Sequence, residues 1–258
     1  MRHTSVQAPS VVDRVLDVFG AFSPERSVLS LSDLSRRARL PLSTTHRIVG
    51  ELTRRGALER QEDGRYRVGL WLWEVASLSP RGMGLRENAM PFLEDLYEAT
   101  HENVQLAVLD VPDVVYVERI SGRNAVSVIS RVGGRLAAHA TGVGLVLLAN
   151  APAEVQEEVL SRPLKAYTSK TISSPERLRR VLADVRRDGF VISDRQVELV
   201  SRSVAAPVYG RDDTVVAAIS IVVPAEGVDL RTLVPAVRAA ARGISRSLGA
   251  PRALRQPF

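Results

Sequence analysis

Hydrophobic residues recur at helical spacing through the first part of the chain, and polar residues occupy the positions between them. The segments 11–22 and 31–38 each carry one apolar side and therefore predict two short helices. Ser30, followed three residues later by Asp33, resembles a capping box, in which side-chain oxygens accept hydrogen bonds from the free N–H groups of a helix start. We therefore expect the second helix to begin at Ser30.

A third helix would have Pro41 in its first turn, where the N–H that proline lacks has no helical partner. Its core side is predicted by the apolar spacing of Thr45, Ile48, Val49 and Leu52. The same spacing leaves four polar residues outward on the early turns, namely Ser43, Thr44, His46 and Arg47. Gly56 would end this helix in a left-handed conformation.

Two strands with a tight turn follow the third helix. Residues 58–60 and 66–68 read as strands, and Asp63-Gly64 between them is a usual hairpin signal. Two helices with a tight turn and a Gly-tipped hairpin form a winged helix-turn-helix, which presents one helix to a major groove and a wing to the neighbouring phosphates. The expected partner is double-stranded DNA.

The charge of this segment agrees with that partner. Residues 36–67 contain nine arginines against four acids, an excess that attracts phosphate. The alternative is that an arginine-rich chain carries such runs on ordinary solvated helix faces. Only Lys165 and Lys170 are lysines, so the arginine excess by itself also fits a codon composition that favours arginine. We expect Ser43, Thr44 and Arg47 at the groove, with Arg47 able to read a guanine or clamp a phosphate, and His46 beside them on the DNA-binding side. The residues expected to hold phosphates are Arg36, Arg37, Arg65 and Arg67.

The chain beyond residue 69 mixes helical and extended patterns. Helices are predicted at 69–78, 85–101, 142–150, 152–160, 175–188 and 230–248. Strands are predicted within 103–120, 125–130, 137–139, 191–194, 203–209 and 215–223. This order with hairpins implies an α+β sheet domain. The predicted organisation is a tail at 1–9, the DNA-binding domain at 10–70, a linker helix and connection at 71–84, an effector-binding and oligomerisation domain at 85–250, and a tail at 251–258.

The connection between the two domains has its own signature. Residues 69–78 are apolar on most faces, which suits a helix packed between domains or against a second subunit. Trp71 and Trp73 are interpreted as packing aromatics of that helix. The helix breakers in 79–84 predict a linker.

Composition narrows the class of protein further. A chain of 258 residues can form one large or two modest domains, and 45% hydrophobic side chains are enough to bury a core. No apolar run approaches the roughly 20 residues that span a bilayer, and the first ten residues lack the apolar stretch of a signal peptide. Cysteine is absent, which excludes disulfides and thiolate metal sites. We expect a cytoplasmic protein without a membrane partner, metal or cofactor.

From residue 11 to residue 248 the chain resembles the IclR-family transcriptional regulators. The family's recognition-helix pattern is matched by Leu40, Pro41, Ser43, Thr44, His46, Arg47, Ile48 and Leu52. Its wing pattern is matched by residues 56–60 and by Tyr66, Val68 and Gly69. The resemblance implies an N-terminal winged helix-turn-helix and a C-terminal α+β domain of GAF-like, effector-binding fold. It also implies a homodimer or a dimer of dimers, with a small metabolite controlling operator affinity. We expect a repressor.

Two segments are similar to the family's effector-binding motifs, 133–149 and 188–224. In the first, a strand and a small-residue turn lead into a helix N-terminus, whose free N–H groups suit a carboxylate. The resemblance to members that bind small acids implies pocket positions at Leu136, Gly142, Val143, Ser193, Ser201, Ser203, Ser220 and Val222.

This chain departs from the family pattern at several of these places. Arg195 and Gln196 stand where two acids are usual, Leu145 replaces a common lysine, Val200 a common glycine, and Val222 a serine of some relatives. These changes remove charges and make the site more apolar. We therefore expect a larger or more hydrophobic effector, an aromatic or acyl acid.

Two other classes of protein compete with this interpretation. An enzyme would have to group His139 with Ser203, Asp194 and Glu198, but these residues form no nucleophile elbow and no metal-ligand spacing. The other alternative is an architectural DNA binder whose sheet domain only oligomerises. Release from DNA by a ligand would separate a regulator from that second class.

Overall fold

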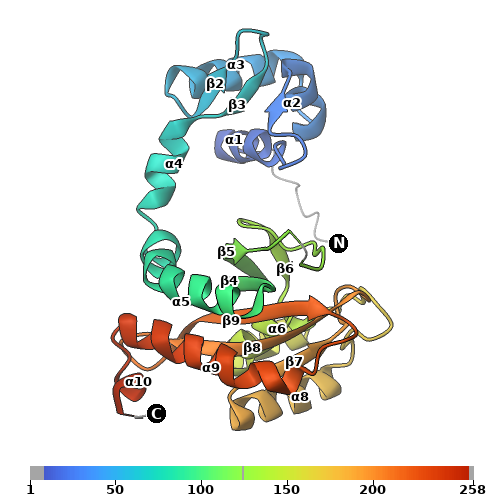
Figure 1. Ribbon diagram of the computed structural model, residues 1–258. Coiled ribbons are helices and arrows are strands. Elements are labelled where there is room, and N and C mark those ends of the chain that lie inside the picture. The colour runs from blue at the N-terminus through green and yellow to red at the C-terminus, as the bar shows by residue number, and fades with distance from the viewer. Residues whose placement is uncertain (1–8, 124, 256–258) are drawn as a thin grey trace, which may run out of the picture. The chain divides into compact units, whose positions relative to one another are not determined.

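The computed structural model describes residues 9–123 and 125–255 (Figure 1). The chain divides into two compact units, the first ending at Ser79 and the second beginning at Pro80. This division falls inside the segment 71–84 that the sequence marks as a connection. Most of the expected tail 1–9 lies outside the described residues.

The first unit is helical with a small antiparallel sheet. Its elements are α1 (Val11–Gly20), β1 (Val28–Leu29), α2 (Leu31–Ala38), α3 (Leu42–Arg54), β2 (Leu58–Arg60), β3 (Tyr66–Val68) and α4 (Leu70–Ser77). The strands lie in the order β1-β3-β2. The helix-turn-helix and its wing are therefore confirmed, and β1 is an addition. A strand of two residues is too short to show alternation in a sequence.

The helix ends follow the local chemistry with two differences. The Ser30 hydroxyl accepts the Asp33 N–H at 3.1 Å, but the Asp33 carboxylate accepts from that hydroxyl at 2.7 Å, so the expected box at α2 is not reciprocal. A reciprocal box forms at α1, between Ser10 and Asp13. Pro41 caps α3 from just outside its first turn. Gly56 has a φ of 73°, which confirms the predicted left-handed end.

The second unit is built around one antiparallel sheet with the strand order β6-β5-β4-β9-β8-β7. Its strands are β4 (Asn103–Asp110), β5 (Asp113–Ile120), β6 (Arg135–Ala137), β7 (Val191–Asp194), β8 (Ser201–Tyr209) and β9 (Val215–Pro224). Its helices are η1 (Pro80–Gly84), α5 (Leu85–Thr100), η2 (Ala138–Ala140), α6 (Gly142–Ala149), α7 (Ala153–Leu160), α8 (Pro175–Asp188), α9 (Leu230–Ser247) and α10 (Pro251–Arg255). The α+β class is confirmed.

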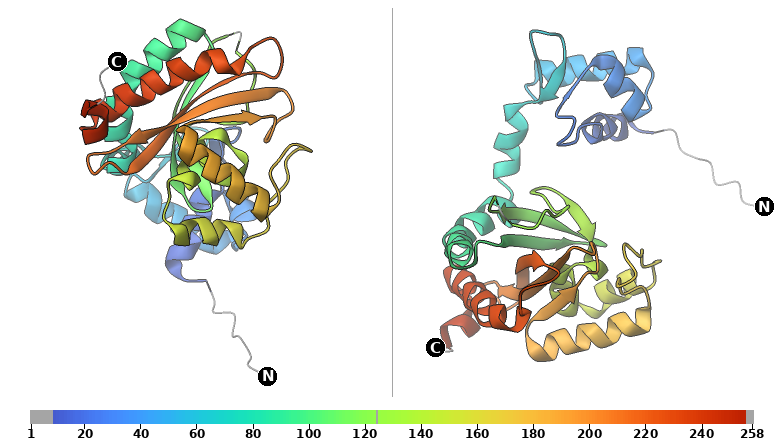
Figure 2. Two further views of the ribbon diagram at one scale, coloured as in Figure 1. Left: turned by 90° about the horizontal axis from the view of Figure 1, so that it is seen from below. Right: turned by 45° about the vertical axis from the view of Figure 1, so that its right-hand side comes forward.

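Helices cover both faces of this sheet (Figure 2). Helices α5 and α9 pack on one face against large side chains such as Leu106, Ile219 and Ile221. Helices α6, α7 and α8 pack on the other, where the central strands contribute alanines, among them Ala205 and Ala218. Alternate residues of a strand point to opposite faces, so the small side chains let α6 lie close to the sheet.

Four sequence expectations are wrong. Residues 125–130 form no strand, because Asn103, Arg119 and Glu198 side chains bond this backbone in place of a neighbouring strand. The strand expected at 137–139 lies earlier, at Arg135–Ala137, and a 3-10 turn follows it. Residues 80–84 form a π-helical turn that runs into α5 rather than a break. Residues 251–255 of the expected tail are helical, and Ala253 is buried.

No helix in the described ranges is long and apolar enough to cross a membrane.

Replacing Leu34 by alanine should destabilise the first unit. Leu34 is fully buried in the core that α2 shares with α3 and the wing strands, and removing such a side chain costs about 2–5 kcal/mol. Calorimetry of the full chain should show a lower unfolding temperature for the first unit and an unchanged second unit. Leu42→Ala is the control, because Leu42 is 52% exposed; equal effects of both changes would contradict the assigned core.

Candidate functional site

The outward side of α3 carries the polar residues that helical spacing placed there. Ser43, His46 and Arg47 are exposed, and Thr44 is half-buried. The opposite side of the helix, with Thr45, Ile48 and Val49, is buried in the core of the first unit. The first turns of the helix thus present short polar side chains and one arginine to solvent, which is the composition that reads base edges in a major groove.

The wing arginines are held by acids of the wing itself. Arg65 Nε donates to Asp63 Oδ2 at 2.7 Å, and Arg67 donates to Glu59 Oε2 at 2.8 Å through Nε. The hydrogen bond and the charge of Asp63 raise the pKa of Arg65, and the same contact lowers the pKa of Asp63. These pairs are exposed and add little to stability. A DNA phosphate can therefore replace the carboxylate as the partner of either guanidinium.

The arginines of α2 differ from each other. Arg36 is exposed and forms an ion pair with Asp33. Arg37 Nε donates to the Ala21 carbonyl at 2.6 Å, so this side chain joins α2 to the end of α1. In the described part of the chain Arg47 has no ion-pair partner. Arg47 therefore offers an uncompensated charge on the face of α3.

A cavity of about 50 Å³ lies in the second unit, between the N-terminus of α6 and the sheet. All eight positions that the family resemblance implied line it: Leu136, Gly142, Val143, Ser193, Ser201, Ser203, Ser220 and Val222. They come from β6, α6, β7, β8 and β9. The structure therefore brings together residues up to 86 positions apart, from 136 to 222.

The strand register explains the polar lining. Ser203 lies opposite Ser193 on one side and Val222 on the other. The next row on the same face lies two residues further along each strand, and in it Ser220 is opposite Ala205 on one side and Gln105 on the other. These side chains share the face on which Ala205 and Ala218 pack against α6. The pocket is therefore the place where serine and glutamine replace alanine on the inner face of the sheet.

The first turn of α6 points into this pocket. The first N–H groups of a helix have no partner within it. Thr141 Oγ1 accepts from the Gly144 N–H at 3.1 Å, while the N–H groups of Gly142 and Val143 have no hydrogen-bond partner among the described residues. A Cβ on Gly142 would lie 2.7 Å from Ser203 Oγ. Glycine thus keeps the helix start and the Ser203 hydroxyl within reach of one ligand.

Further polar residues of the pocket were not among those predicted. Gln105 Nε2 donates to Ser130 Oγ at 2.7 Å, and both are buried. Tyr116 is buried beside them; burial raises the pKa of its hydroxyl, and the charge of Glu198 raises it further. The one glutamine inside the otherwise apolar stretch VQLAVL was visible in the sequence and could have indicated a polar position on the buried face of this strand.

Two loops close over the pocket. Glu198 Oε2 accepts the Ile129 N–H at 3.1 Å and so joins residues 195–200 to residues 125–134. Gln196 is buried, and its amide donates to Ser193 Oγ at 3.2 Å. The glutamine that stands where the family pattern has an acid therefore orients a hydroxyl of the pocket.

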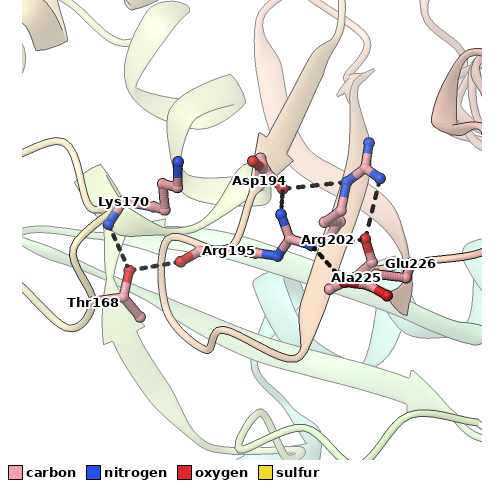
Figure 3. Close-up of polar contacts among 7 residues, drawn as sticks. All are labelled: Thr168, Lys170, Asp194, Arg195, Arg202, Ala225 and Glu226. Atoms are coloured by element: carbon pink, nitrogen blue, oxygen red, sulfur yellow. Dashed lines mark hydrogen bonds and ion pairs between the residues drawn. The ribbon is translucent and has the colours of Figure 1, made fainter.

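Neighbouring residues contact both the backbone and the guanidinium of Arg195, as Figure 3 shows. Its φ is 53°, and the Thr168 hydroxyl fixes this conformation by donating to the Arg195 carbonyl at 2.6 Å. Its guanidinium lies 3.7 Å from both Asp194 and Glu226 and donates to the Ala225 carbonyl. The charge that replaces an acid is thus compensated locally.

The residues of the enzymatic alternative have other partners. His139 Nε2 lies 3.0 Å from the Lys165 carbonyl oxygen, and burial lowers the pKa of its imidazole. Glu198 bonds the Ile129 backbone, and Asp194 lies 3.2 Å from Arg202 Nε. Of the four, Ser203 and Glu198 line the pocket.

Comparison with known proteins identifies the family of both units. The model of the bacterial transcriptional regulator IclR C-terminal domain matches residues 79–246, and that of the IclR helix-turn-helix domain matches residues 11–62. The chain belongs to the IclR family. This places an IclR helix-turn-helix on α2 and α3, and an IclR effector-domain fold on the second unit.

Individual relatives of this IclR-family chain are transcriptional regulators. The chain is 31% identical over 245 residues to the HTH-type transcriptional regulator XynR of Escherichia coli (strain K12), covering 93% of this chain and 97% of that protein. It is 32% identical over 197 residues to the transcriptional repressor IclR of the same strain, covering 75% of this chain and 72% of that protein. A solved IclR homolog complexed with 4-hydroxybenzoate, from Microbacterium hydrocarbonoxydans, is 42% identical with a TM-score of 0.88, covering 93% and 99%.

Replacing Arg47 by alanine should abolish sequence preference without unfolding the protein, because Arg47 is exposed and contributes no core contact. The measurement is binding to a labelled fragment from upstream of its own gene, titrated with salt and with random DNA. Each good bidentate base contact is worth about 1–3 kcal/mol, so the specific complex should weaken by about tenfold or more.

Arg54→Ala is the matched control for this change. Arg54 lies in the last turn of α3, exposed and paired with Glu51. Replacing it should weaken binding to the operator and to random DNA equally, or leave both unchanged. Intact operator preference in Arg47→Ala would remove Arg47 from the reading role.

Proposed function

We propose that this protein is a transcriptional repressor whose affinity for its operator is lowered by an aromatic carboxylic acid bound in the second unit. The observation that carries the proposal is the pocket: eight positions implied by acid-binding relatives line one cavity at a helix start. A relative with 42% identity is complexed with 4-hydroxybenzoate. The pocket's role is binding, and we assign no reaction to it.

The carboxylate would bind at the first turn of α6. The N–H groups of Gly142 and Val143 and the positive end of the helix dipole favour an anion there. The Ser203 hydroxyl lies close to that helix start, 2.7 Å from where a Cβ on Gly142 would be, and can donate to the carboxylate. The apolar side chains of Leu136 and Val222 line the same cavity and can contact an aromatic ring.

A second polar group on the ring would meet the row of Gln105 and Ser220. This row lies two residues, or about 6.7 Å, along the strands from the Ser203 row. A benzene ring with a polar group at each end can span that separation. The two rows therefore favour a para-substituted aromatic acid such as 4-hydroxybenzoate.

Binding requires the two loops over the pocket to move. The cavity holds about 50 Å³, whereas a cavity of about 150 Å³ is known to accept benzene. The loops at 125–134 and 195–200 can separate at the Glu198–Ile129 contact, and they already expose Ile129, Leu199 and Val200. A ligand that fits only the opened arrangement shifts the protein toward it.

The protein would act as a homodimer or a dimer of dimers. Large apolar side chains of the first unit are exposed on α1 and α4 and just beyond α4: Val11, Val12, Leu16, Leu70, Trp71, Trp73, Val75 and Leu78. Apolar patches of this kind mark interaction surfaces. A second copy that covers them would place two α3 helices on half-sites about 34 Å, or a multiple of it, apart.

Addition of 4-hydroxybenzoate should raise the unfolding temperature of the second unit and weaken operator binding. Ser203→Ala should weaken the acid's binding and spare DNA binding, because it removes one donor without adding bulk. Gly142→Ala should lower the affinity for the acid more, by about tenfold or greater, since its Cβ would lie 2.7 Å from Ser203 Oγ. Calorimetric titration measures the affinity of both variants for 4-hydroxybenzoate.

Gly84→Ala is the control for added bulk, since a Cβ there would meet no atom within 4 Å. If neither 4-hydroxybenzoate, benzoate nor a smaller acid changes the affinity for the operator, the architectural DNA binder is favoured. Binding of glyoxylate-sized acids alone would refute the aromatic assignment.

Trp73→Glu should yield a monomer. Trp73 is 58% exposed in the single chain, so the change leaves the protomer core intact and places a charge in the proposed interface. Light scattering during gel filtration measures the mass. Leu199→Glu is the control, because Leu199 is equally exposed but lies in the second unit; a monomeric wild-type protein would refute the proposed assembly.

A further inference from the structure

A second hollow lies in the second unit where β7 ends. In the described residues, β7 pairs with β8 only from Val191 opposite Ala205 to Asp194 opposite Arg202. The remainder of β8, from Ala206 to Tyr209, therefore has one open edge. A hollow of about 520 Å³ is bounded by this edge, by α9 and by α10; Figure 1 shows α9 and α10. None of its lining residues belongs to the effector pocket.

Three guanidinium groups line this hollow. Arg238 and Arg242 lie one turn apart on α9, and Arg252 lies on α10. The Arg252 guanidinium lies 4.4 Å from the centre of the Tyr209 ring, which fixes its orientation. All three arginines are exposed.

The positive charge of the hollow is not compensated. Among the residues that the structure describes, none of the three guanidiniums has an ion-pair partner. Asp213 is the one acid in the lining, and its carboxylate accepts the backbone N–H of Arg252 at 2.9 Å. That carboxylate is thus used to hold the start of α10.

Two of the five arginines on α8 are, by contrast, paired with acids. On α8, Arg179 pairs with Glu157, and Arg187 pairs with Asp184 and Asp188. Helix α9 contains four arginines and no acid in its 18 residues. Like charges one turn apart on a helix repel each other, so an anion between Arg238 and Arg242 would relieve a cost that the free protein bears.

We propose that this hollow is a second binding site, for a small phosphorylated metabolite. Its volume lies in the range of small-molecule sites, about 300–1,000 Å³. The arginine fork matches the oxygens of a phosphate group in pairs, and the contact with Tyr209 preorganises one fork. The site is independent of the effector pocket and of the proposed aromatic acid.

The test is calorimetric titration of the full-length protein with inorganic pyrophosphate at low salt. We expect saturable binding of one pyrophosphate per chain at this hollow. The double variant Arg238→Gln/Arg242→Gln should lower the affinity by about tenfold or more. Both residues are exposed, so the variant should keep its unfolding temperature.

Two control variants separate a site from general charge attraction. Arg177→Gln/Arg180→Gln removes the same charge from exposed positions of α8 and should leave pyrophosphate binding unchanged. Arg47→Ala should also leave it unchanged, which separates the hollow from the DNA-binding face. An equal loss of pyrophosphate affinity in the α8 variant would overturn the proposal.

Three further outcomes would overturn it. No pyrophosphate binding to the wild-type protein would show that the hollow is not a phosphate site. Tighter binding of the tricarboxylate tricarballylate than of pyrophosphate would refute the phosphate class. Weakened operator binding in the Arg238→Gln/Arg242→Gln variant, with pyrophosphate binding intact, would assign this surface to DNA instead.

Discussion

The close approach of helix α6 to the sheet is the contact on which the second unit depends. A Cβ on Gly144 would lie 2.1 Å from the Ala138 carbonyl oxygen, so no side chain fits between this helix and the turn before it. Every residue of α6 is buried. The packing brings a helix N-terminus, with its free N–H groups, against the inner face of a sheet. The pocket results where serine and glutamine replace alanine on that face.

The same packing settles the electrostatics of the pocket. The replacement of two acids by Arg195 and Gln196 was expected to change the charge of the site, and the structure shows how. Arg195 and Arg202 line the pocket, but Asp194 lies near both guanidiniums and Glu226 lies near that of Arg195, so their charges are compensated at its edge. Gln196 orients Ser193 without adding charge. The positive end of α6 therefore meets a lining whose acid is Glu198, at the loop contact.

Local pattern predicted the elements that carry their own periodicity. The amphipathic segments at α3, α8 and α9 were found with nearly correct ends, because helical spacing and capping residues act over a few positions. The loop at 125–130 could not be read in this way, since its backbone is bonded by Asn103, Arg119 and Glu198 from distant segments. The eight pocket positions came from family resemblance. Gln105, which resemblance did not supply, becomes a pocket residue only through its register with Ser220.

A chain of polar contacts connects the pocket with the start of the second unit. Ser130 lines the pocket, and its carbonyl accepts from Arg119 at 2.8 Å. The Arg119 N–H donates to Glu118, whose other carboxylate oxygen pairs with Arg86 in the first turn of α5. Helix α5 continues from the π-helical turn at Pro80–Gly84 without the break that the sequence predicted. Ser130 at the pocket is thus joined, through Arg119, Glu118 and Arg86, to a helical segment that runs without a break from Pro80 to Thr100.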